Sequence, residues 1–293
     1  MIVRQESRPV IEKLRIQNYR VLRDVTFDHL TPLTVLFGPN GSGKSTVFDV
    51  FAFLNEAFTT NLRRAWDRRN RMHEIRSRGE DGPVVFEIKY REGHKGTPDG
   101  NLVTYRLAID EQKGLPTVIE ETLRWSTAPG SGRSRDILAF ANGAGTVYDE
   151  PTASNSHEQL DSPDLLAVST LGQLSRHPRV AALRRFISGW YLSYVSADHA
   201  RALPDAGPQE RLSQSGDNLP NVVQYLQEQH PDRLAEIFRR LGERVPNLER
   251  LEPEQLADQR LVAMTDNGSQ LGSLWMEGYF GVGDPLVRSG RPA

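Results

Sequence analysis

The order of hydrophobic and polar residues changes its period several times along the chain. Alternation of polar and apolar residues over 13–18, and again over 25–30, predicts short strands. The apolar run 34–37 predicts a buried strand that leads directly into a glycine-rich loop. After this loop, apolar residues at spacings of three and four predict a helix that begins at Lys44. These apolar residues are Val47, Phe48, Phe51, Leu54 and Phe58.

Between residues 82 and 125 the period of the pattern becomes two. Segments 84–90, 102–109 and 117–125 predict three strands separated by turn-rich stretches, which together form an antiparallel sheet. Glu120 and Glu121 are neighbours on the last of these strands. Because neighbouring side chains on a strand point to opposite faces, we do not expect the two carboxylates to act as an acid–base pair.

The middle of the chain is richer in turn-forming residues. Segments 127–136 and 142–162 contain many Gly, Ser, Pro, Asn and Asp residues and predict loops or a loosely ordered insertion around a short strand-like piece at 137–140. Ser162 followed by Pro163 predicts a helix start, because Ser caps helices and Pro suits the first helical position.

Further helices and one strand are predicted beyond this point. A helix should start after Pro178, and 189–196 predicts a strand buried on both faces within the central sheet. Apolar stripes then predict a helix from Leu219 and another after Pro231.

The glycine-rich loop carries the strongest chemical signal in the sequence. Gly38, Gly43, Lys44 and Ser45 have the G-x-x-x-x-G-K-[ST] spacing, between a predicted strand and a predicted helix. Glycines allow backbone N–H groups to turn toward a phosphate, Lys44 supplies a cation for the β- and γ-phosphates, and the Ser45 hydroxyl can ligate Mg²⁺. The predicted nucleotide-binding set is Gly38, Pro39, Asn40, Gly41, Ser42, Gly43, Lys44, Ser45 and Thr46, with Lys44 also the catalytic candidate.

Two stretches resemble one family of ATPases. The string Leu14-x-Ile16-x-Asn18-Tyr19-Arg20-x-Leu22, followed by the phosphate loop, is similar to the opening of the RecF/SMC-like branch of ABC-type ATPases. That branch includes the OLD-like proteins often grouped with AAA-type ATPases. The resemblance implies ATP with Mg²⁺, hydrolysis by head-to-head homodimers, and nucleotide contacts from residues at the positions of Asn18 and Arg20.

The resemblance also defines a fold class and a division of the chain. It implies an α/β P-loop NTPase core with an antiparallel β subdomain and a helical region. We expect an N-terminal lobe over 1–126, a loop-rich insertion over 127–162, a helical region over 163–250 and a tail over 251–293. The absence of an Asn-Lys-x-Asp motif favours ATP over GTP.

Some parts of a complete ATPase are not found in the sequence. Such an enzyme needs a carboxylate at the end of a second apolar strand to hold Mg²⁺. The nearest candidate run, 261–266, is polar just before its acid. The segment 272–285 resembles the extreme C-terminus of full-length family members. We therefore expect an internally shortened chain, joined between about residues 252 and 265, whose ATP hydrolysis is weak or absent.

Composition excludes several other classes of function. The chain has no cysteine, which excludes disulfides and cysteine-ligated zinc. A net charge of −2 gives no overall attraction to nucleic acid or anionic membranes. The sequence contains neither a secretory signal nor an apolar run of about 18 residues, so we expect a cytoplasmic protein without a membrane contact.

An arginine-rich segment leaves a second function open. Its arginines, with Trp66 between them, could bind nucleic-acid phosphates while Trp66 stacks on a base. Alternatively, they form a solvated helix face with Trp66 packed inward, which the acidic balance of the chain favours. A nucleotide-gated module of a repair or anti-phage system, and a non-functional truncated product, also stay open. The arginines are Arg63, Arg64, Arg68, Arg69 and Arg71.

Overall fold

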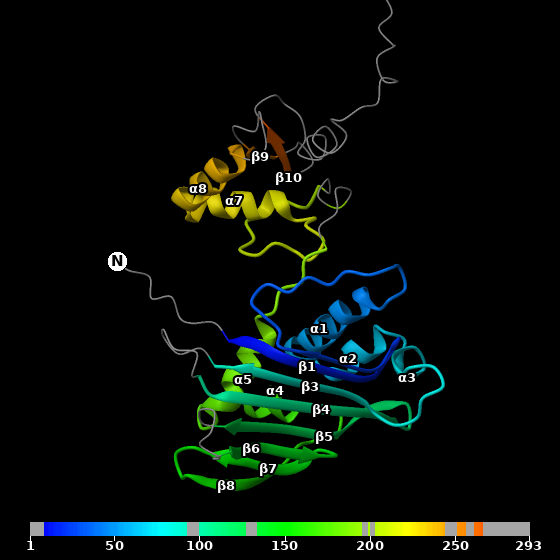
Figure 1. Cartoon of the computed structure of the whole chain (residues 1–293). Coiled ribbons are helices and arrows are strands. Elements are labelled where there is room, and N and C mark those ends of the chain that lie inside the picture. Colours follow the sequence, from blue (N-terminus) through cyan, green and yellow to red (C-terminus); the bar gives the residue numbers. More distant parts are fainter. Residues whose placement is uncertain are drawn as a thin grey trace, which may run out of the picture. The chain divides into compact units, whose positions relative to one another are not determined.

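The computed structural model describes residues 9–92, 100–126, 134–194, 199, 203–243, 251–255 and 261–265. The chain divides into two compact units, Met1–Trp190 and Tyr191–Ala293, which are described separately. The first unit is a mixed structure in which one eight-stranded sheet is combined with helices (Figure 1). It contains the glycine-rich loop and is therefore the unit that bears on function.

All neighbouring strands of the large sheet are antiparallel. The sheet order is β2-β1-β3-β4-β5-β6-β7-β8, so that β3 to β8 form a continuous meander. The strands are β1 (Val10–Tyr19), β2 (Leu22–Asp28), β3 (Val84–Arg91), β4 (Leu102–Gln112), β5 (Leu115–Ser126), β6 (Ser134–Ala141), β7 (Ala144–Asp149) and β8 (Ser154–Gln159).

The three strands predicted between residues 84 and 125, and their antiparallel arrangement, are confirmed. The short strand-like piece predicted at 137–140 is confirmed as part of β6. The interpretation of the rest of 127–162 as loops or an insertion is wrong, because β6, β7 and β8 extend the same sheet. Asn142 and Gly143 form the tight turn between β6 and β7, and residues 150–153, which include Pro151, connect β7 to β8. Such turn-forming residues dominate the sequence signal over short strands. Residues 127–133 lie outside the described part of the chain.

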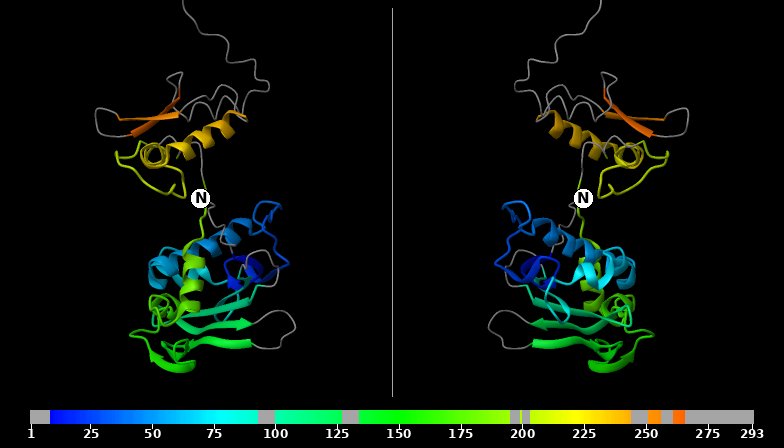
Figure 2. Two further views of the ribbon diagram at one scale, coloured as in Figure 1. Left: turned by 90° about the vertical axis from the view of Figure 1, so that its left-hand side faces the viewer. Right: turned by 90° about the vertical axis from the view of Figure 1, so that its right-hand side faces the viewer.

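Alternation along the strands makes the sheet apolar on one face and polar on the other. On β3, Phe86 and Ile88 are fully buried, whereas Glu87 and Lys89 between them are partly exposed. An antiparallel sheet with one solvated face has this pattern. The apolar face packs with the helices into one hydrophobic core, and Figure 2 shows α5 (Pro178–Ser188) on one face of the sheet, running across the strands.

The other helices of this unit are short apart from the first. They are α1 (Lys44–Thr59), α2 (Leu62–Asp67), α3 (Arg71–Ile75) and α4 (Ala167–Leu171). The start of α1 at Lys44 and the start of α5 at Pro178 are confirmed. The predicted start at Ser162 is wrong, since α4 begins only at Ala167.

A buried carboxylate takes the capping role that the sequence suggested for Ser162. Glu121 on β5 is fully buried, and it accepts hydrogen bonds from the backbone N–H of Ala167 (2.5 Å), from that of Val168 (3.2 Å) and from the Tyr105 hydroxyl (3.0 Å). Its neighbour Glu120 lies on the opposite face and pairs with Arg106 at 3.0 Å. The two glutamates therefore point apart, as the strand geometry predicts.

Two predicted strands are absent from the structure. Residues 34–37 form no strand, and Val35 and Phe37 are 72% and 92% exposed. The described part of 189–196 also forms no strand, and Tyr191 and Tyr194 are exposed. Both predictions were wrong for the same physical reason: an apolar run becomes a buried strand only where neighbouring strands pair with it, and none does so in the described residues.

The second unit has a small core of its own. It consists of α7 (Leu219–Gln229), α8 (Pro231–Gly242), and the antiparallel pair β9 (Leu251–Gln255) and β10 (Leu261–Thr265). Val223 and Leu234 are the buried centre of the two helices, which confirms the two predicted helical stripes. The predicted family-like tail 272–285 lies outside the described residues.

Candidate nucleotide-binding loop

The glycine-rich loop turns sharply between an extended segment and the first helix. The backbone N–H of Ser42 donates to the Pro39 carbonyl oxygen at 3.3 Å, and Gly41 and Gly43 have φ angles of 82° and 91°. A Cβ at Gly43 would lie 3.1 Å from side-chain atoms of both Val21 and Leu22. Glycine is therefore required at Gly43 both by the left-handed backbone and by the close approach of the turn between β1 and β2.

Lys44 bends back over the loop that precedes it. Its Nζ donates to the carbonyl oxygens of Gly38 (2.8 Å) and Pro39 (2.7 Å), and lies 3.5 Å from the Ser42 hydroxyl oxygen. This places an ammonium group at the loop while the loop itself, residues 38–42, is exposed. A cation is thus held beside backbone that is open to a ligand.

The N-terminus of α1 has the chemistry of an anion site. The helix has no acidic residue in its first turn and no side chain caps it, so its first N–H groups have no intrahelical acceptor. The helix dipole adds positive potential at the same end. Ser45 in this first turn is exposed, and its hydroxyl could ligate Mg²⁺ beside a bound phosphate.

Asp49, the carboxylate on α1 near the loop, is held by hydrogen bonds and ion pairs within the protein. Asp49 on α1 is 2.6 Å from the Tyr19 hydroxyl, 3.2 Å from the Arg20 guanidinium and 3.0 Å from that of Arg69. Burial, with the Asp49 charge adding to it, raises the pKa of Tyr19, so the phenol stays protonated and donates to Asp49. Within the described residues, no group of three or more His, Asp or Glu side chains gathers where it could hold a metal ion.

The two residues singled out by family resemblance occupy different environments. Asn18 is buried, and its side-chain amide donates to the carbonyl oxygens of Asp81, Gly82 and Pro83 at 3.0–3.3 Å. This amide holds two parts of the fold together. Arg20 is partly exposed, with a φ of 52°, and its side chain reaches α1 through Asp49. The contact of either residue with a nucleotide stays a prediction.

The arginine-rich segment is largely built into the structure. Trp66 is fully buried and its indole N–H donates to Glu111 at 3.0 Å. This confirms the favoured interpretation, in which Trp66 packs inward, and it excludes the alternative in which Trp66 stacks on a base. Arg69, 8% exposed, pairs with Asp49 and Glu56 at 3.0 Å, and Arg68 pairs with the same Glu56.

The other arginines lie at the surface. Arg63 and Arg64 are exposed on α2, and Arg71 pairs with Asp67 one turn away at 2.8 Å. A basic cavity of about 650 Å³ lies where this segment meets the turn between β1 and β2. Most guanidinium groups around it have acidic partners within the fold. Those partners are Asp49 for Arg20, Glu80 for Arg23, Glu56 for Arg68, and Asp110 for Arg76.

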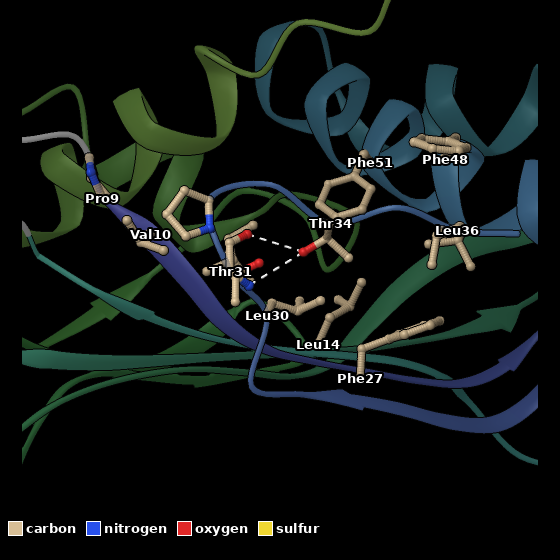
Figure 3. A pocket seen from close by; sticks show the side chains of 13 residues that line it. Pro9, Val10, Leu14, Phe27, Leu30, Thr31, Thr34, Leu36, Phe48 and Phe51 are labelled. Carbon is tan, nitrogen blue, oxygen red and sulfur yellow. Dashed lines mark hydrogen bonds between the residues drawn. The ribbon is translucent and has the colours of Figure 1, made fainter.

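A second, apolar pocket of about 570 Å³ lies between the start of the sheet and α1 (Figure 3). Phe48 and Phe51 reach into it from α1, and Leu14 and Phe27 from the sheet. The segment that leads into the phosphate loop passes over this pocket and contributes Thr34 and Leu36. The pocket is open because this segment is not packed into a sheet.

Comparison with known families agrees with the reading of the loop. Residues 13–147 match a protein family described as AAA domain. The matched stretch covers less than half of the chain, and it includes the phosphate loop, α1 and most of the large sheet. The match supports an ATP-binding, AAA-type ATPase. No curated protein matches the chain.

Sequence reasoning missed the groups that fix the loop and its helix in place. Buried Tyr19 and Arg69 join the partly exposed Asp49 in one polar network, although the three residues lie far apart in the sequence. The only local signal was Asp49, an acidic residue among the apolar positions of the predicted helix. No described helix is long and apolar enough to cross a membrane.

Proposed function

We propose that this protein binds Mg²⁺-ATP at the loop Gly38–Thr46. The observation that carries the proposal is the placement of Lys44 over a sharply turned, exposed loop at the uncapped N-terminus of α1. Three sources of positive potential, the ammonium, the backbone N–H groups and the helix dipole, converge on one exposed surface. A triphosphate is the ligand that such an arrangement suits best.

We further propose that the protein is related to the RecF/SMC-like ATPases. In this proposal Ser45 ligates Mg²⁺ between the β- and γ-phosphates, and Thr46 and Asn40 line the same loop. Arg20 contacts the nucleotide from the turn between β1 and β2, which touches the loop at Gly43. Adenine is the expected base, and head-to-head pairing of two ATPase heads is the expected homodimer.

We further propose that this chain hydrolyses ATP slowly or not at all. A carboxylate on a second strand normally holds Mg²⁺, and another positions the attacking water. The nearest carboxylate along α1, Asp49, is occupied by Tyr19, Arg20 and Arg69. An internal shortening between about residues 252 and 265 accounts for the missing strand, and resequencing of the source DNA would test it.

Thermal melting with and without Mg²⁺-ATP tests the binding proposal. A ligand present at 100 times its Kd stabilises a folded protein by about 2.7 kcal/mol, so the melting temperature should rise by several degrees. Lys44→Ala should abolish this rise. Lys89→Ala is the matched control, because it removes a lysine from the polar face of the sheet, away from the loop. This variant should keep the rise in melting temperature with Mg²⁺-ATP.

The outcomes separate binding from catalysis. A rise that persists in Lys44→Ala would show that the nucleotide binds elsewhere, and no rise in the folded wild-type protein would contradict the proposal. A phosphate-release assay should be run on the same samples. We expect the wild-type protein to release phosphate no faster than Lys44→Ala, whose rate defines the background. A wild-type rate well above that background would overturn the proposal of impaired hydrolysis while leaving ATP binding intact.

A further inference from the structure

The basic cavity beside the turn between β1 and β2 is a surface that the phosphate loop does not use. Ten of the described residues line it, of which six are arginines and one, Glu74, is a carboxylate. None of the loop residues 38–46 is among them. The cavity is therefore separate from the loop, and its lining consists mainly of guanidinium groups. The arginines are Arg20, Arg23, Arg68, Arg69, Arg76 and Arg78.

Three of these arginines share two carboxylates within the described part of the chain. Arg69 pairs with both Asp49 and Glu56 at 3.0 Å, Arg20 pairs with Asp49 at 3.2 Å, and Arg68 pairs with Glu56 at 2.9 Å. Neither of the two carboxylates lines the cavity. The carboxylates therefore hold the guanidinium groups in place, and this group of five side chains keeps an excess of positive charge.

Arg78 adds a guanidinium group that is exposed and has no acidic partner among the described residues. Arg23, which is 70% exposed on its side chain, donates to the Arg78 carbonyl oxygen at 3.5 Å and pairs with Glu80 at 3.3 Å. Glu74, the carboxylate of the lining, lies 3.3 Å from the His73 ring. Because a guanidinium group has five N–H donors, Arg23 and Arg78 both keep donors for a ligand.

The backbone that carries these arginines is fixed on both sides of the cavity. The N–H of Arg20 donates to the Ile75 carbonyl oxygen at 2.6 Å, and the N–H of Ser77 donates to that of Asn18 at 3.3 Å. Arg20 and Asn70 also have left-handed backbone, with φ angles of 52° and 59°, which non-glycine residues adopt at a cost. The turn and the segment around α3 are therefore held together without a ligand, which lowers the entropy cost of binding one.

We propose that this basic cavity binds a small molecule that carries two or more adjacent phosphate groups. Guanidinium groups match phosphate oxygens in pairs, and several of them around one hollow favour a ligand with more than one negative charge. A volume of about 650 Å³ lies within the range of small-molecule sites. The site is additional to the Mg²⁺-ATP site proposed above and does not depend on it.

The lining is less well matched to nucleic acid, which also carries phosphates. Sites for single strands combine basic groups with aromatic side chains on which bases stack. Among the described residues, the lining contains no Trp, Tyr or Phe, and Trp66 is fully buried. Duplex binding neutralises phosphates along an extended backbone rather than within one hollow. Nucleic acid is therefore the alternative that the experiment must exclude.

Isothermal titration calorimetry with inorganic tripolyphosphate tests the site in the full chain carrying Lys44→Ala. This background removes the cation of the phosphate loop, and Mg²⁺ is left out so that the probe stays uncomplexed. We expect one tripolyphosphate to bind per chain. Orthophosphate at the same ionic strength should bind at least about tenfold more weakly, because it reaches fewer guanidinium groups.

Two matched double variants in the Lys44→Ala background distinguish a built site from general charge. Arg23→Gln with Arg78→Gln removes two arginines of the lining, and Arg63→Gln with Arg64→Gln removes two arginines of α2 that do not line the cavity. The first pair should weaken tripolyphosphate binding by at least about tenfold, and the second by less than about twofold. All four arginines are exposed, so circular dichroism should show both variants folded.

Arg78→Gln alone is a milder variant, because it breaks no ion pair in the part of the chain that the structure describes. It should weaken tripolyphosphate binding in the same direction as the double variant. Unchanged binding in both Arg78→Gln and the double variant would overturn the site.

The other outcomes also decide the proposal. Equal weakening by the two double variants would overturn it, since the probe would then respond to overall charge. No binding to the folded Lys44→Ala protein, or orthophosphate binding as tightly as tripolyphosphate, would overturn it as well. An oligonucleotide that binds through Arg23 and Arg78, and that tripolyphosphate does not displace, would assign the cavity to nucleic acid instead.

The same variants keep this site distinct from the proposed ATP site. In otherwise wild-type protein, Arg23→Gln with Arg78→Gln should keep the rise in melting temperature with Mg²⁺-ATP, because neither arginine belongs to the phosphate loop. Failure of ATP binding would leave the tripolyphosphate result standing. Failure of tripolyphosphate binding would likewise leave the ATP proposal standing.

Discussion

The two sides of α1 face very different surroundings. On one side, Phe53 is fully buried, with its ring 5.6 Å from Phe86 and 6.2 Å from Trp66 between centroids. On the other side, Phe48 is 45% exposed above an open apolar pocket, beside the bare segment 33–37. The same helix is therefore a core element toward the sheet and a surface element toward the strand that leads into its own N-terminus.

The residues that stabilise the first unit and the residues proposed to bind ATP therefore lie on opposite sides of α1. The packed side contains the aromatic cluster and the Asp49 network, which fix the helix in position. The bare side carries the phosphate loop and the unpaired segment. We conclude that the helix can present its N-terminus to a ligand even though the surface beside it is uncovered.

The largest expected effect is on the free energy of unfolding, when a phenylalanine on the packed side of α1 and one on its bare side are each replaced by alanine. Phe53→Ala should lower the free energy of unfolding by about 3–5 kcal/mol, because it empties a fully buried site among aromatic rings. Phe37→Ala should change it by less than about 0.5 kcal/mol. Urea denaturation of both variants at low protein concentration measures the pair. A similar loss in both would mean that the bare side is covered.

A pH titration should sharpen the description of the packed side. Burial raises the pKa of Glu121 from 4.5 to about 7, and this outweighs the opposing effect of its hydrogen bonds. Because the pKa of Glu121 is higher in the folded state than in the unfolded state, protonation of this carboxyl group stabilises the folded protein. The resulting contribution to the unfolding free energy is complete below about pH 4.5 and is lost as the pH rises through about 7. Across that window the unfolding free energy should fall by on the order of 3 kcal/mol.

Two neighbouring variants isolate this contribution. Glu121→Gln should remove this part of the pH dependence, because its amide does not titrate. Glu120→Gln, on the solvated face of the same strand, should keep it. Urea denaturation at several pH values provides the comparison, and parallel curves for wild type and Glu121→Gln would refute the assignment.

The smallest expected effect on stability comes from replacing glycines of the phosphate loop, where the chain enters α1. Gly41 and Gly43 both have left-handed backbone, but only Gly43 lies against Val21 and Leu22. Gly41→Ala should therefore destabilise by about 1 kcal/mol through backbone strain, and Gly43→Ala by about 2 kcal/mol, since the packed turn must also move. Thermal melts of both variants test this, and equal shifts would show that the turn yields freely.

The packed side was the part most accessible from sequence. Alternating residues predicted β3, β4 and β5, and the spacing of Val47 to Phe58 predicted α1, because local periodicity reports directly on which face is buried. The strand-like piece at 137–140 predicted part of β6, but β7 and β8 were missed because small and polar residues dominate the composition of that stretch. The polar network around Asp49 was also missed, as it joins residues brought together only by the tertiary fold.

The bare side shows where a local pattern is insufficient. The apolar run before the loop has the composition of a buried strand, but burial depends on neighbours that the local sequence does not specify. The phosphate loop itself was recognisable because its spacing reflects backbone chemistry rather than tertiary contacts. Its placement at the start of α1 agrees with that recognition, and nucleotide binding stays a prediction for experiment.

The strand order of the large sheet has a consequence for how quickly the protein folds. From β3 to β8 each strand pairs with its neighbour in sequence, and so do β1 and β2. Among the strand pairs of this sheet in the described residues, only the pairing of β1 with β3 closes a long loop, and that loop contains the phosphate-binding segment and α1 to α3. Because closure of long loops slows folding, we expect this pairing to limit the rate. A nucleotide that orders the loop would then act on the slowest step.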